Sequence, residues 1–370
     1  MAKILIPTPL RQFVEKHDSV ELPGATVGEV LSALTARFPD LRKQLFNDEG
    51  KLRSFVNVYL NDEDIRYLQK DATAVAGGDT LSIVPSIAGG AVDAPASQVP
   101  ARQAPAAAMP VSLSKEEILR YSRHLIMPEV GMEGQLKLKN ASVLLVGTGG
   151  LGAPLGLYLA AAGIGRITLI DDDVVEESNL QRQTLFTPAD IGQPKAEVAA
   201  EWLRRFDDAI EVHAHVGRVE GNTAAQMLDD KTVVLDGCDN FATRLVVSDT
   251  CVALQVPLTS AAVGRFQGQV ANFAGHLPDQ ACYRCFVGDA FDAEDCDSCA
   301  ADGVLGAFVG MVGTLAAMQA IRVVLAGAIP NSPLGDPQYG RLHLIEGLVP
   351  SIRTLKIAKD SECTTCGTQH

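Results

Sequence analysis

Residues 143–152 read VLLVGTGGLG, and this stretch decides the fold of most of the chain. The apolar residues predict a buried strand, the glycines predict a turn, and the small residues after Gly152 predict a helix. A second apolar run, residues 167–170, ends on Asp171. Strand, glycine turn, helix, strand and acid in this order predict the nucleotide-binding unit of a doubly wound α/β sheet.

The glycine turn, with Gly147, Gly149, Gly150 and Gly152, is the first candidate binding site. Residues without side chains let backbone amides approach phosphate oxygens, and the helix start adds the positive end of a dipole. Asp171 stands where an acid hydrogen-bonds ribose hydroxyls in such a Rossmann-like unit. Taken alone, the pattern is also typical of an NAD-dependent oxidoreductase, which is the first alternative.

Polar residues beyond the second strand favour a different nucleotide chemistry. Residues 178–183 read SNLQRQ and residues 192–195 read GQPK, which supplies Asn179, Arg182 and Lys195. A redox cofactor does not need cations at this place. ATP cut at its α-phosphorus does, because negative charge builds on the phosphoryl oxygens in the transition state. Either cation singly is better explained as a solvated surface residue, but the ordered set favours nucleotidyl transfer.

From about Ser114 to its C-terminus, the chain resembles the ThiF/MoeB/HesA adenylyltransferases, which are relatives of ubiquitin-activating enzymes. The matching motifs run in order through this region: RYSR at 120–123, the glycine turn, SNLQRQ at 178–183, GQPK at 192–195, LDGCDN at 235–240, CYRC at 282–285 and CTTC at 363–366. The resemblance implies that the nucleotide is ATP, and that Asn179, Arg182 and Lys195 contact its phosphates.

Two further residues complete the expected catalytic set. The resemblance implies that Asp239 binds the Mg²⁺ that bridges the phosphates. The local sequence agrees, because residues 232–235 read as a buried strand with Asp239 beyond its carboxyl end, where open α/β sheets bind ligands. A capping or turn aspartate is the plain alternative. The resemblance also implies that Arg123 reaches into the nucleotide site of a partner protomer, and hence a homodimer; a surface arginine is the alternative.

The cysteines form three C-x-x-C pairs, and a tetrahedral zinc site needs two of them. The pairs are Cys282/Cys285, Cys296/Cys299 and Cys363/Cys366. Spacing alone does not choose between them. The resemblance selects the first and third pairs as a structural Zn²⁺ site. It places Cys299 where some relatives use a cysteine in thioester or acyl-disulfide chemistry. Cys296 departs from the family's usual pattern and is a candidate resolving thiol; two thiols in a loop are the alternative. Cys238 and Cys251 are expected to be packing residues.

Residues 1–90 predict a separate β-grasp, or ubiquitin-like, domain. The expected elements are a hairpin of residues 3–7 and 19–22, a helix begun by a capping box at residues 26–29, and strands at residues 55–60 and 80–84. The sequences FVNVYLNDED at 55–64 and PSIAGG at 85–90 are similar to the ThiS/MoaD sulfur carriers. The similarity is greatest to the carrier of carrier-dependent cysteine biosynthesis.

The end of this domain, Gly89-Gly90, has a chemical meaning in such a carrier. Without side chains it can thread a narrow channel and bring a carboxylate beside an α-phosphate. The alternative is that the two glycines only open a flexible linker. Residues 91–112 are rich in Ala and Pro and predict a semi-extended linker. Residues 112–117 then predict a capped helix that carries Arg123.

Composition excludes several classes of partner. The chain has 370 residues, with 31 basic and 45 acidic ones, and a net charge of −14 without a basic block argues against nucleic acid. Residues 1–7 read as a strand and not as a signal peptide, and cysteine pairs in a chain without an export signal favour metal or sulfur chemistry, so we expect a cytoplasmic protein. Residues 303–321 are uncharged and could suggest a membrane span, but their glycine spacing favours a buried helix and no membrane.

We therefore expect three parts: a carrier-like domain at 1–90, a linker at 91–112 and an adenylyltransferase domain at 113–370. The expected activity is ATP-dependent adenylation of the C-terminal glycine of a ubiquitin-like sulfur carrier, for thiocarboxylate formation in cysteine, molybdopterin or thiamin biosynthesis. The expected partners are that carrier, an external sulfur donor and a processing protease. A non-catalytic scaffold that recruits sulfur-transfer partners is the second alternative.

Overall fold

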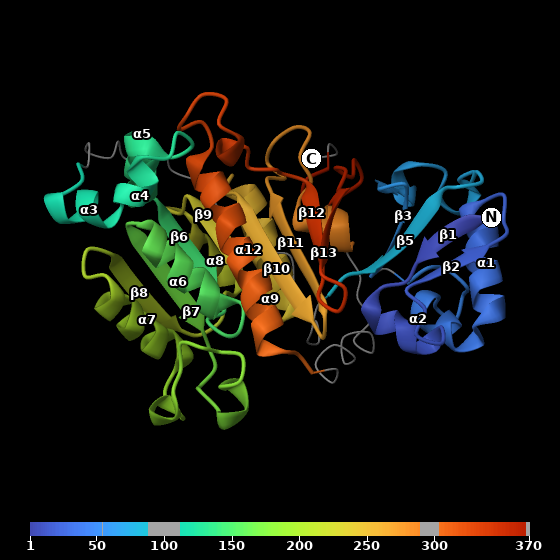
Figure 1. Cartoon of the computed structure of the whole chain (residues 1–370), viewed down its shortest axis with the longest axis horizontal. Coiled ribbons are helices and arrows are strands. Elements are labelled where there is room, and N and C mark those ends of the chain that lie inside the picture. The colour runs from blue at the N-terminus through green and yellow to red at the C-terminus, as the bar shows by residue number, and fades with distance from the viewer. Residues whose placement is uncertain (54, 88–111, 289–302, 368–370) are drawn as a thin grey trace.

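The computed structural model describes residues 1–53, 55–87, 112–288 and 303–367. Its strands form two sheets (Figure 1), one of five strands in the order β2-β1-β5-β3-β4 and one of eight in the order β13-β12-β11-β10-β9-β6-β7-β8. The five-stranded sheet belongs to the N-terminal unit, and the eight-stranded sheet belongs to everything after residue 112. A Rossmann-like sheet preceded by a β-grasp unit was the expected fold class, and the structure confirms it.

The N-terminal unit is one long helix packed on a mixed sheet. Its elements are β1 (Ala2–Leu5), β2 (Ser19–Leu22), α1 (Val27–Arg37), α2 (Arg42–Leu45), β3 (Val56–Leu60), β4 (Glu63–Asp64) and β5 (Thr80–Pro85). The expected hairpin is present, with Ala2 opposite Leu22 in an antiparallel pair, and β5 lies parallel to β1 and antiparallel to β3. The hydroxyl of Thr26 caps α1 as expected, but Glu29 completes the cap one residue earlier, by accepting from Ala25 N.

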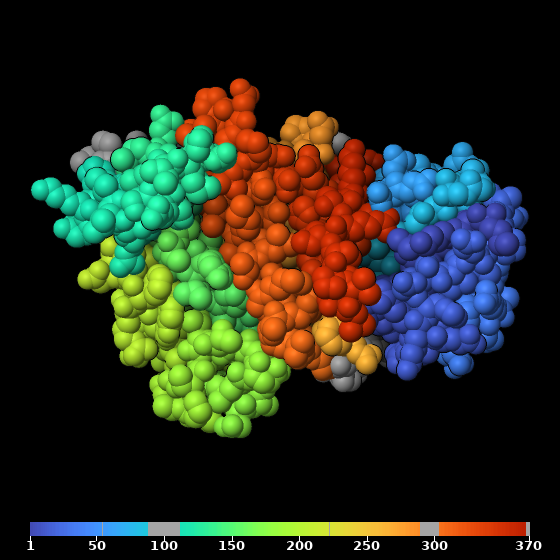
Figure 2. Space-filling view, viewed as in Figure 1, coloured from blue at the N-terminus to red at the C-terminus, as the bar shows by residue number. Residues whose placement is uncertain are grey.

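Two faces of this small sheet are buried, although an isolated sheet of this size has one solvent face. Val58 and Ile83 belong to the core beneath α1. Tyr59 and Val84 point the other way and join a hydrophobic cluster of the larger unit. Asn57 of β3 is only 2% exposed, and its side-chain amide donates to Val84 O and to the Ser86 hydroxyl. In the space-filling view the N-terminal unit lies directly against the strands β12 and β13 (Figure 2).

The larger unit is a doubly wound sheet with an antiparallel extension. Its strands are β6 (Ser142–Val146), β7 (Arg166–Asp171), β8 (Glu211–Val216), β9 (Val233–Asp236), β10 (Leu258–Gly264), β11 (Gln267–Phe273), β12 (Arg341–Glu346) and β13 (Ser351–Lys356). The strands β10, β9, β6, β7 and β8 are parallel, and β11 to β13 add antiparallel pairs. The chain order reverses at β6, which lies between β9 and β7, and such a reversal opens a binding crevice at the carboxyl ends of the strands.

Helices cover both faces of the large sheet. They are α3 (Lys115–Arg120), α4 (Ser122–Leu125), α5 (Gly131–Asn140), α6 (Gly152–Ala162), α7 (Lys195–Phe206), α8 (Gly221–Leu228), α9 (Phe241–Ala253), α10 (Tyr283–Val287) and α12 (Gly306–Leu325). Figure 1 shows α6, α7 and α12 on the near face and α8 and α9 behind the sheet. The expected single helix after residue 114 is broken at Tyr121, so the sequence prediction was wrong there and Arg123 lies on a second short helix.

The uncharged segment near residue 303 forms α12, as the glycine spacing predicted. By length and composition α12 could cross a membrane, but 61% of its most apolar window is buried inside the protein. Close approach depends on glycine, because a Cβ on Gly268 of β11 would lie 2.4 Å from Val312 of this helix. The helix therefore serves as the core helix that packs across β10 and β11.

Candidate functional site

The glycine turn follows β6 in the conformation that the sequence predicted. Gly147 has φ +85°, a left-handed value that favours glycine. A Cβ on Gly152 would lie 2.1 Å from the carbonyl oxygen of Gly147, so a side chain there would force the turn open. The helix α6 begins at Gly152 and points its N-terminus at the same turn. Gly149 and Gly150 lie between these two positions, so all four predicted glycines form one loop at the carboxyl edge of the sheet.

Asp171 fixes the far side of this loop. Its carboxylate accepts hydrogen bonds from the backbone N–H of Thr148 at 2.7 Å and from the Thr148 hydroxyl at 3.0 Å. The backbone N–H of Asp173 donates to its other oxygen at 2.9 Å. Asp171 is half-buried, so its carboxylate remains in reach of a ligand on the solvent side. Its expected contact with ribose hydroxyls stays a prediction.

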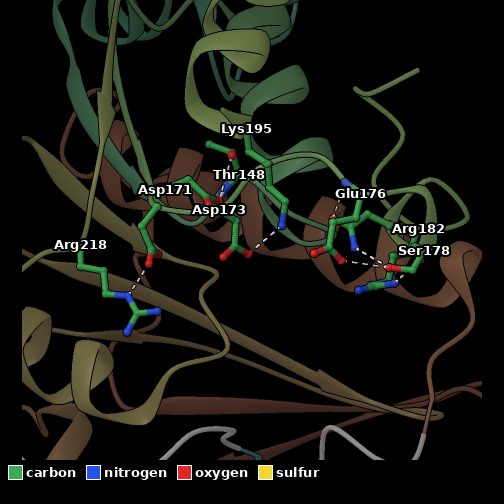
Figure 3. Close-up of polar contacts among 10 residues, drawn as sticks. Thr148, Asp171, Asp173, Glu176, Ser178, Arg182, Lys195 and Arg218 are labelled. Atoms are coloured by element: carbon green, nitrogen blue, oxygen red, sulfur yellow. Dashed lines mark hydrogen bonds and ion pairs between the residues drawn. The ribbon is translucent and has the colours of Figure 1, made fainter. Parts of the chain in front are cut away.

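Three cationic residues lie along the same edge (Figure 3). Lys195, at the first turn of α7, is 5% exposed and pairs with Asp173 at 2.8 Å. Arg218 pairs with Asp172 at 2.6 Å. Arg182 is half-buried and donates to the backbone oxygen of Ser178 at 3.0 Å. Cations held mainly by exposed partners can exchange them for phosphate oxygens at little cost, because exposed ion pairs contribute little free energy.

The run Asp171-Asp172-Asp173 was only partly recognised in the sequence. The carboxylate oxygens of these residues lie within 4.8 Å of one another and could hold a cation. Asp172 and Asp173 were missed because consecutive acids after a strand look like a solvated loop. Their partners Arg218 and Lys195 come from distant segments, so only the fold reveals the pairing.

One aspartate ends β9 and another follows it, and the two have different surroundings. Asp236 is 1% exposed, pairs with Arg244 at 3.0 Å and accepts from the hydroxyl of Ser260 at 3.2 Å. Burial works to lower the pKa of Arg244, but the Asp236 carboxylate raises it, and the net pKa of Arg244 lies above its ordinary value. Asp239 is exposed, and no described residue forms a hydrogen bond or ion pair with it. Of the two acids at this edge, Asp239 is therefore available to a ligand, whereas Asp236 stabilises the loop through its ion pair with Arg244.

Arg244 was not predicted as a site residue from the sequence. Its guanidinium also donates to the carbonyl oxygens of Cys238 and Ala261. These bonds tie the loop before Asp239 to the neighbouring strand β10. A buried arginine on a helix carries no local signal, because its partners are six and more residues away. The only hint was Asp236, an acid that ends a buried strand.

Arg123 lies at the opposite end of the unit from the glycine turn. Tyr121, two residues before Arg123, places it there. The Tyr121 ring lies against Gly163 at the C-terminus of α6, where a Cβ on Gly163 would be 2.6 Å from the ring. The helix α6 has 11 residues, which separates its two ends by about 16 Å. Arg123 is exposed, with no hydrogen bond or ion pair to a described residue. The structure thus does not bring Arg123 into the nucleotide edge of its own chain.

Four cysteines form a buried cluster behind the sheet. The Sγ atoms of Cys282 and Cys363 are 3.6 Å apart, those of Cys285 and Cys366 are 3.4 Å apart, and all four lie within 4.8 Å of one another. Thiolates around a tetrahedral Zn²⁺, with bonds of about 2.3 Å, have sulfur atoms roughly 3.8 Å apart. The four residues therefore fit a metal ion of this kind. The set is the one that the resemblance selected.

Several predicted residues lie outside the described part of the chain. They are Gly89, Gly90, Cys296 and Cys299. Of the two cysteines expected to serve packing, Cys251 is 3% exposed, and burial raises the pKa of its thiol. Cys238 is only half-buried and lies against the glycine turn, where its backbone would be 3.1 Å from a Cβ on Gly147.

The end of the N-terminal unit approaches the nucleotide edge. The backbone N–H of Ile87 donates to Oε1 of Gln269 at 3.2 Å, and a Cβ on Gly264 would lie 3.6 Å from the Ile87 side chain. Gly264 is the last residue of β10, which runs parallel to β9. Because parallel strands end at the same edge of a sheet, Ile87 lies on the side where the glycine turn and Asp239 lie.

Comparison with protein families gives two matches. The model of the ThiF family matches residues 121–365. The chain belongs to the ThiF family. The model of the ThiS family matches residues 4–90, which is the β-grasp unit. The residues matched to the ThiF family include the glycine turn, the cations, Asp239 and three of the four clustered cysteines, with Cys366 just beyond them. Below, the ThiF part means residues 113–370 and the ThiS part means residues 1–90.

Relatives of known name align with the ThiF part. The chain is 41% identical over 259 residues to the sulfur carrier protein adenylyltransferase of Thermus thermophilus, with 69% of this chain and 92% of that protein covered. It is 40% identical over 259 residues to adenylyltransferase and sulfurtransferase MOCS3 of Mus musculus, and 40% identical over 251 residues to the probable adenylyltransferase/sulfurtransferase MoeZ of Mycobacterium tuberculosis. The match spans only 54% of the mouse protein and 62% of MoeZ.

Solved structures show the same fold for the ThiF part. The crystal structure of E. coli MccB with ATP has a TM-score of 0.57 and 24% identity, over 67% of this chain and 73% of that one. The structure of PaaA has a TM-score of 0.56 and 18% identity, over 70% of this chain and 79% of that one. These likenesses concern the fold alone.

Proposed function

We propose that the ThiF part adenylates the C-terminal carboxylate of a ubiquitin-like sulfur carrier, and that the ThiS part is such a carrier. The observation that carries the proposal is the meeting of the two parts. A β-grasp unit packs on the sheet of a nucleotide-type fold, and its last described residue, Ile87, lies at the carboxyl edge of that sheet, the edge that holds the glycine turn, Lys195 and Asp239. A dehydrogenase needs no carrier tail at its nucleotide site, and a scaffold that only recruits partners needs no nucleotide site.

The proposed reaction is a displacement at phosphorus. A carboxylate oxygen of Gly90 attacks the α-phosphorus of ATP, the new P–O bond forms, and the bond to the pyrophosphate leaving group breaks. The products are the carrier acyl-adenylate and pyrophosphate. The chain positions the reactants and stabilises the charge that develops on the phosphoryl oxygens. A sulfur donor, separate from this reaction, would then convert the acyl-adenylate to a thiocarboxylate.

Each residue of the edge has a proposed part in this reaction. The backbone amides of the glycine turn and the N-terminus of α6 bind phosphate oxygens, and Asp171 orients the ribose. Asn179, Arg182 and Lys195 bind the phosphate chain, the lysine by exchanging Asp173 for a phosphate oxygen. Asp239, an exposed carboxylate with no described partner, fits a Mg²⁺ ligand, and Mg²⁺ would neutralise phosphate charge there.

The test is the exchange of labelled pyrophosphate into ATP. The enzyme part with a carrier that ends in Gly90 should catalyse the exchange, because adenylation is reversible. It should show no hydride transfer to NAD⁺. Pyrophosphate exchange in the absence of the carrier, or hydride transfer to NAD⁺ without such exchange, would contradict the proposed function.

Arg123 is proposed to act in the nucleotide site of a partner protomer. It lies about one helix length from the glycine turn of its own chain. Exposed apolar side chains on α5, α6 and α12 are Met132, Tyr158, Met311 and Met318. Exposed apolar side chains on these helices would be covered in an interface between subunits. We therefore propose a homodimer in which each site takes one arginine from its neighbour.

Mixing two inactive variants tests this arrangement. Arg123→Ala and Asp239→Ala should each lack exchange activity, whereas a mixture refolded from equal amounts should recover about a quarter of wild-type activity, because half of the dimers then contain one intact site of two. The control is the same mixture without refolding, in which subunits have not exchanged. If the refolded mixture stays inactive, Arg123 acts within its own chain or not at all.

The cysteine cluster is proposed to bind one structural Zn²⁺ per chain, which ties the C-terminal segment to α10. Cys363→Ser should remove the zinc and lower the melting temperature, because binding energy at a structural site is folding energy. Cys299→Ser is the matched control, since it changes a thiol of the pair that the cluster does not include, and it should keep the metal. Metal analysis of the two purified variants checks the result. Zinc lost from Cys299→Ser and kept in Cys363→Ser would reverse the assignment.

A further inference from the structure

The tail of the ThiS part leaves its own sheet with one edge unpaired. The strand β5 lies between β3 and β1, but its pairing with β1 ends where Leu5 meets Ser82. On the β3 side the pairing continues, because Ser86 N donates to Phe55 O at 2.8 Å. The opposite edge of the tail therefore presents backbone groups that no strand of the ThiS part reaches.

Within the part of the chain that the structure describes, one side chain of the ThiF part occupies this edge. Gln269 of β11 donates from Nε2 to Pro85 O at 2.7 Å and accepts at Oε1 from Ile87 N at 3.2 Å. It is 4% exposed, so both bonds lie out of water. A residue of a parallel strand bonds its neighbour in the same way, to the oxygen of one residue and the nitrogen two residues on. The amide of Gln269 thus replaces β1 where β1 ends.

From this geometry we infer that Gln269 is a positioning residue that sets the direction in which the carrier tail enters the nucleotide edge. It binds main-chain atoms only, so it accepts any residue at position 87 that has an N–H and rejects proline. The tail needs three more residues from Ile87 to Gly90, which span about 10 Å when extended. An error of direction at Ile87 would therefore displace the carboxylate at Gly90. This consequence for catalysis rests on the proposed function, but the pairing itself does not.

Hydrogen exchange of the Ile87 amide in the intact chain tests the pairing without any use of activity. In Gln269→Leu the amide should exchange about fivefold faster, the factor that corresponds to the loss of one net hydrogen bond. Gln267→Leu is the matched control. Gln267 lies on the same strand and is 7% exposed, and its side-chain oxygen has no hydrogen-bond partner within the described residues. The control should leave the Ile87 amide unchanged.

Two outcomes would overturn the inference. The first is an Ile87 amide that exchanges at the wild-type rate in Gln269→Leu, or equally fast in both variants. The second is an increase in the radius of gyration of Gln269→Leu in solution scattering, which would show that the ThiS part has left its seat altogether. Gln269 would then hold the whole domain and would not position the tail. Either outcome leaves pyrophosphate exchange, and with it the proposed function, to be judged separately.

Discussion

Asp239→Ala is expected to abolish carrier adenylation and to leave the fold intact. Asp239 is exposed at the carboxyl edge and has no partner among the described residues, so its loss costs the fold little. Its proposed Mg²⁺ neutralises phosphate charge, and losing that effect raises the barrier by several kcal/mol, which is at least about a hundredfold in rate. Pyrophosphate exchange measures the rate, and thermal unfolding measures the fold.

Two other aspartates serve as controls for this prediction. Asp208→Ala changes an exposed acid at the amino edge of the sheet and should alter neither rate nor stability. Asp236→Ala should unfold the chain more easily, because it leaves the buried Arg244 without its partner, at a cost of about 3–5 kcal/mol. Near-normal exchange by Asp239→Ala would remove Asp239 from the mechanism.

The intact chain is expected to form no adenylate on its own Gly90. Gly90 is bonded to Ala91 as the chain is written, so its carbonyl belongs to an amide and has no carboxylate oxygen to attack ATP. We also expect the ThiS part to exclude a free carrier, because it is covalently tethered and is therefore present at a high effective concentration. We therefore propose that a protease, of the JAMM type that is associated with such carriers, cuts after Gly90 and creates the substrate.

Three preparations test self-inhibition: the intact chain, the chain cut after Gly90, and residues 113–370 with a separate carrier of residues 1–90. Pyrophosphate exchange should appear only in the last two. The separate carrier is expected to fold, because the core beneath α1 consists of its own residues. If the intact chain activates a free carrier as fast as residues 113–370 do, self-inhibition is wrong. If cells contain only uncut protein, the ThiS part is a docking module and not a carrier.

Exchanging the two charges of an ion pair between the ThiS and ThiF parts tests whether docking, without cleavage, is enough to block a free carrier. Arg353 of β13 forms an ion pair with Asp62 and also donates to Ser82 of β5. In the intact chain, Arg353→Asp should repel its own ThiS part, and a free carrier with Asp62→Arg should then be adenylated. The same free carrier should fail with the unchanged intact chain. Activity in neither combination would mean that this ion pair does not select the carrier.

Local sequence was enough to predict the parts of the site that depend on neighbouring residues. The glycine turn, Asp171 at the end of β7 and the buried strand before Asp239 were all correct, because apolar runs and glycines act within a few residues. The cysteine set needed more than spacing, since three equal pairs were available and only the resemblance chose between them. The structure agrees with that choice.

Contacts between distant segments could not be predicted. The second buried face of β3, with Tyr59, looked like the solvent face of a small sheet until the ThiF part covered it. Arg244 and Gln269 carry no local signal, because their partners lie on other strands or in the other unit. The break at Tyr121 was also missed, since its ring packs against Gly163 and so ends a helix that the sequence would have continued.

The mass of the carrier after incubation with ATP tests most directly whether the ThiF part adenylates its Gly90. Residues 113–370 are incubated with ATP, Mg²⁺ and a carrier of residues 1–90, and the carrier is then weighed by mass spectrometry under conditions that preserve acyl-phosphates. We expect a carrier that is heavier by one adenylyl group, located on Gly90, and no such gain in mass for a carrier that ends in Gly90 amide. An unchanged carrier mass, or an adenylyl group on any other residue, would contradict this expectation.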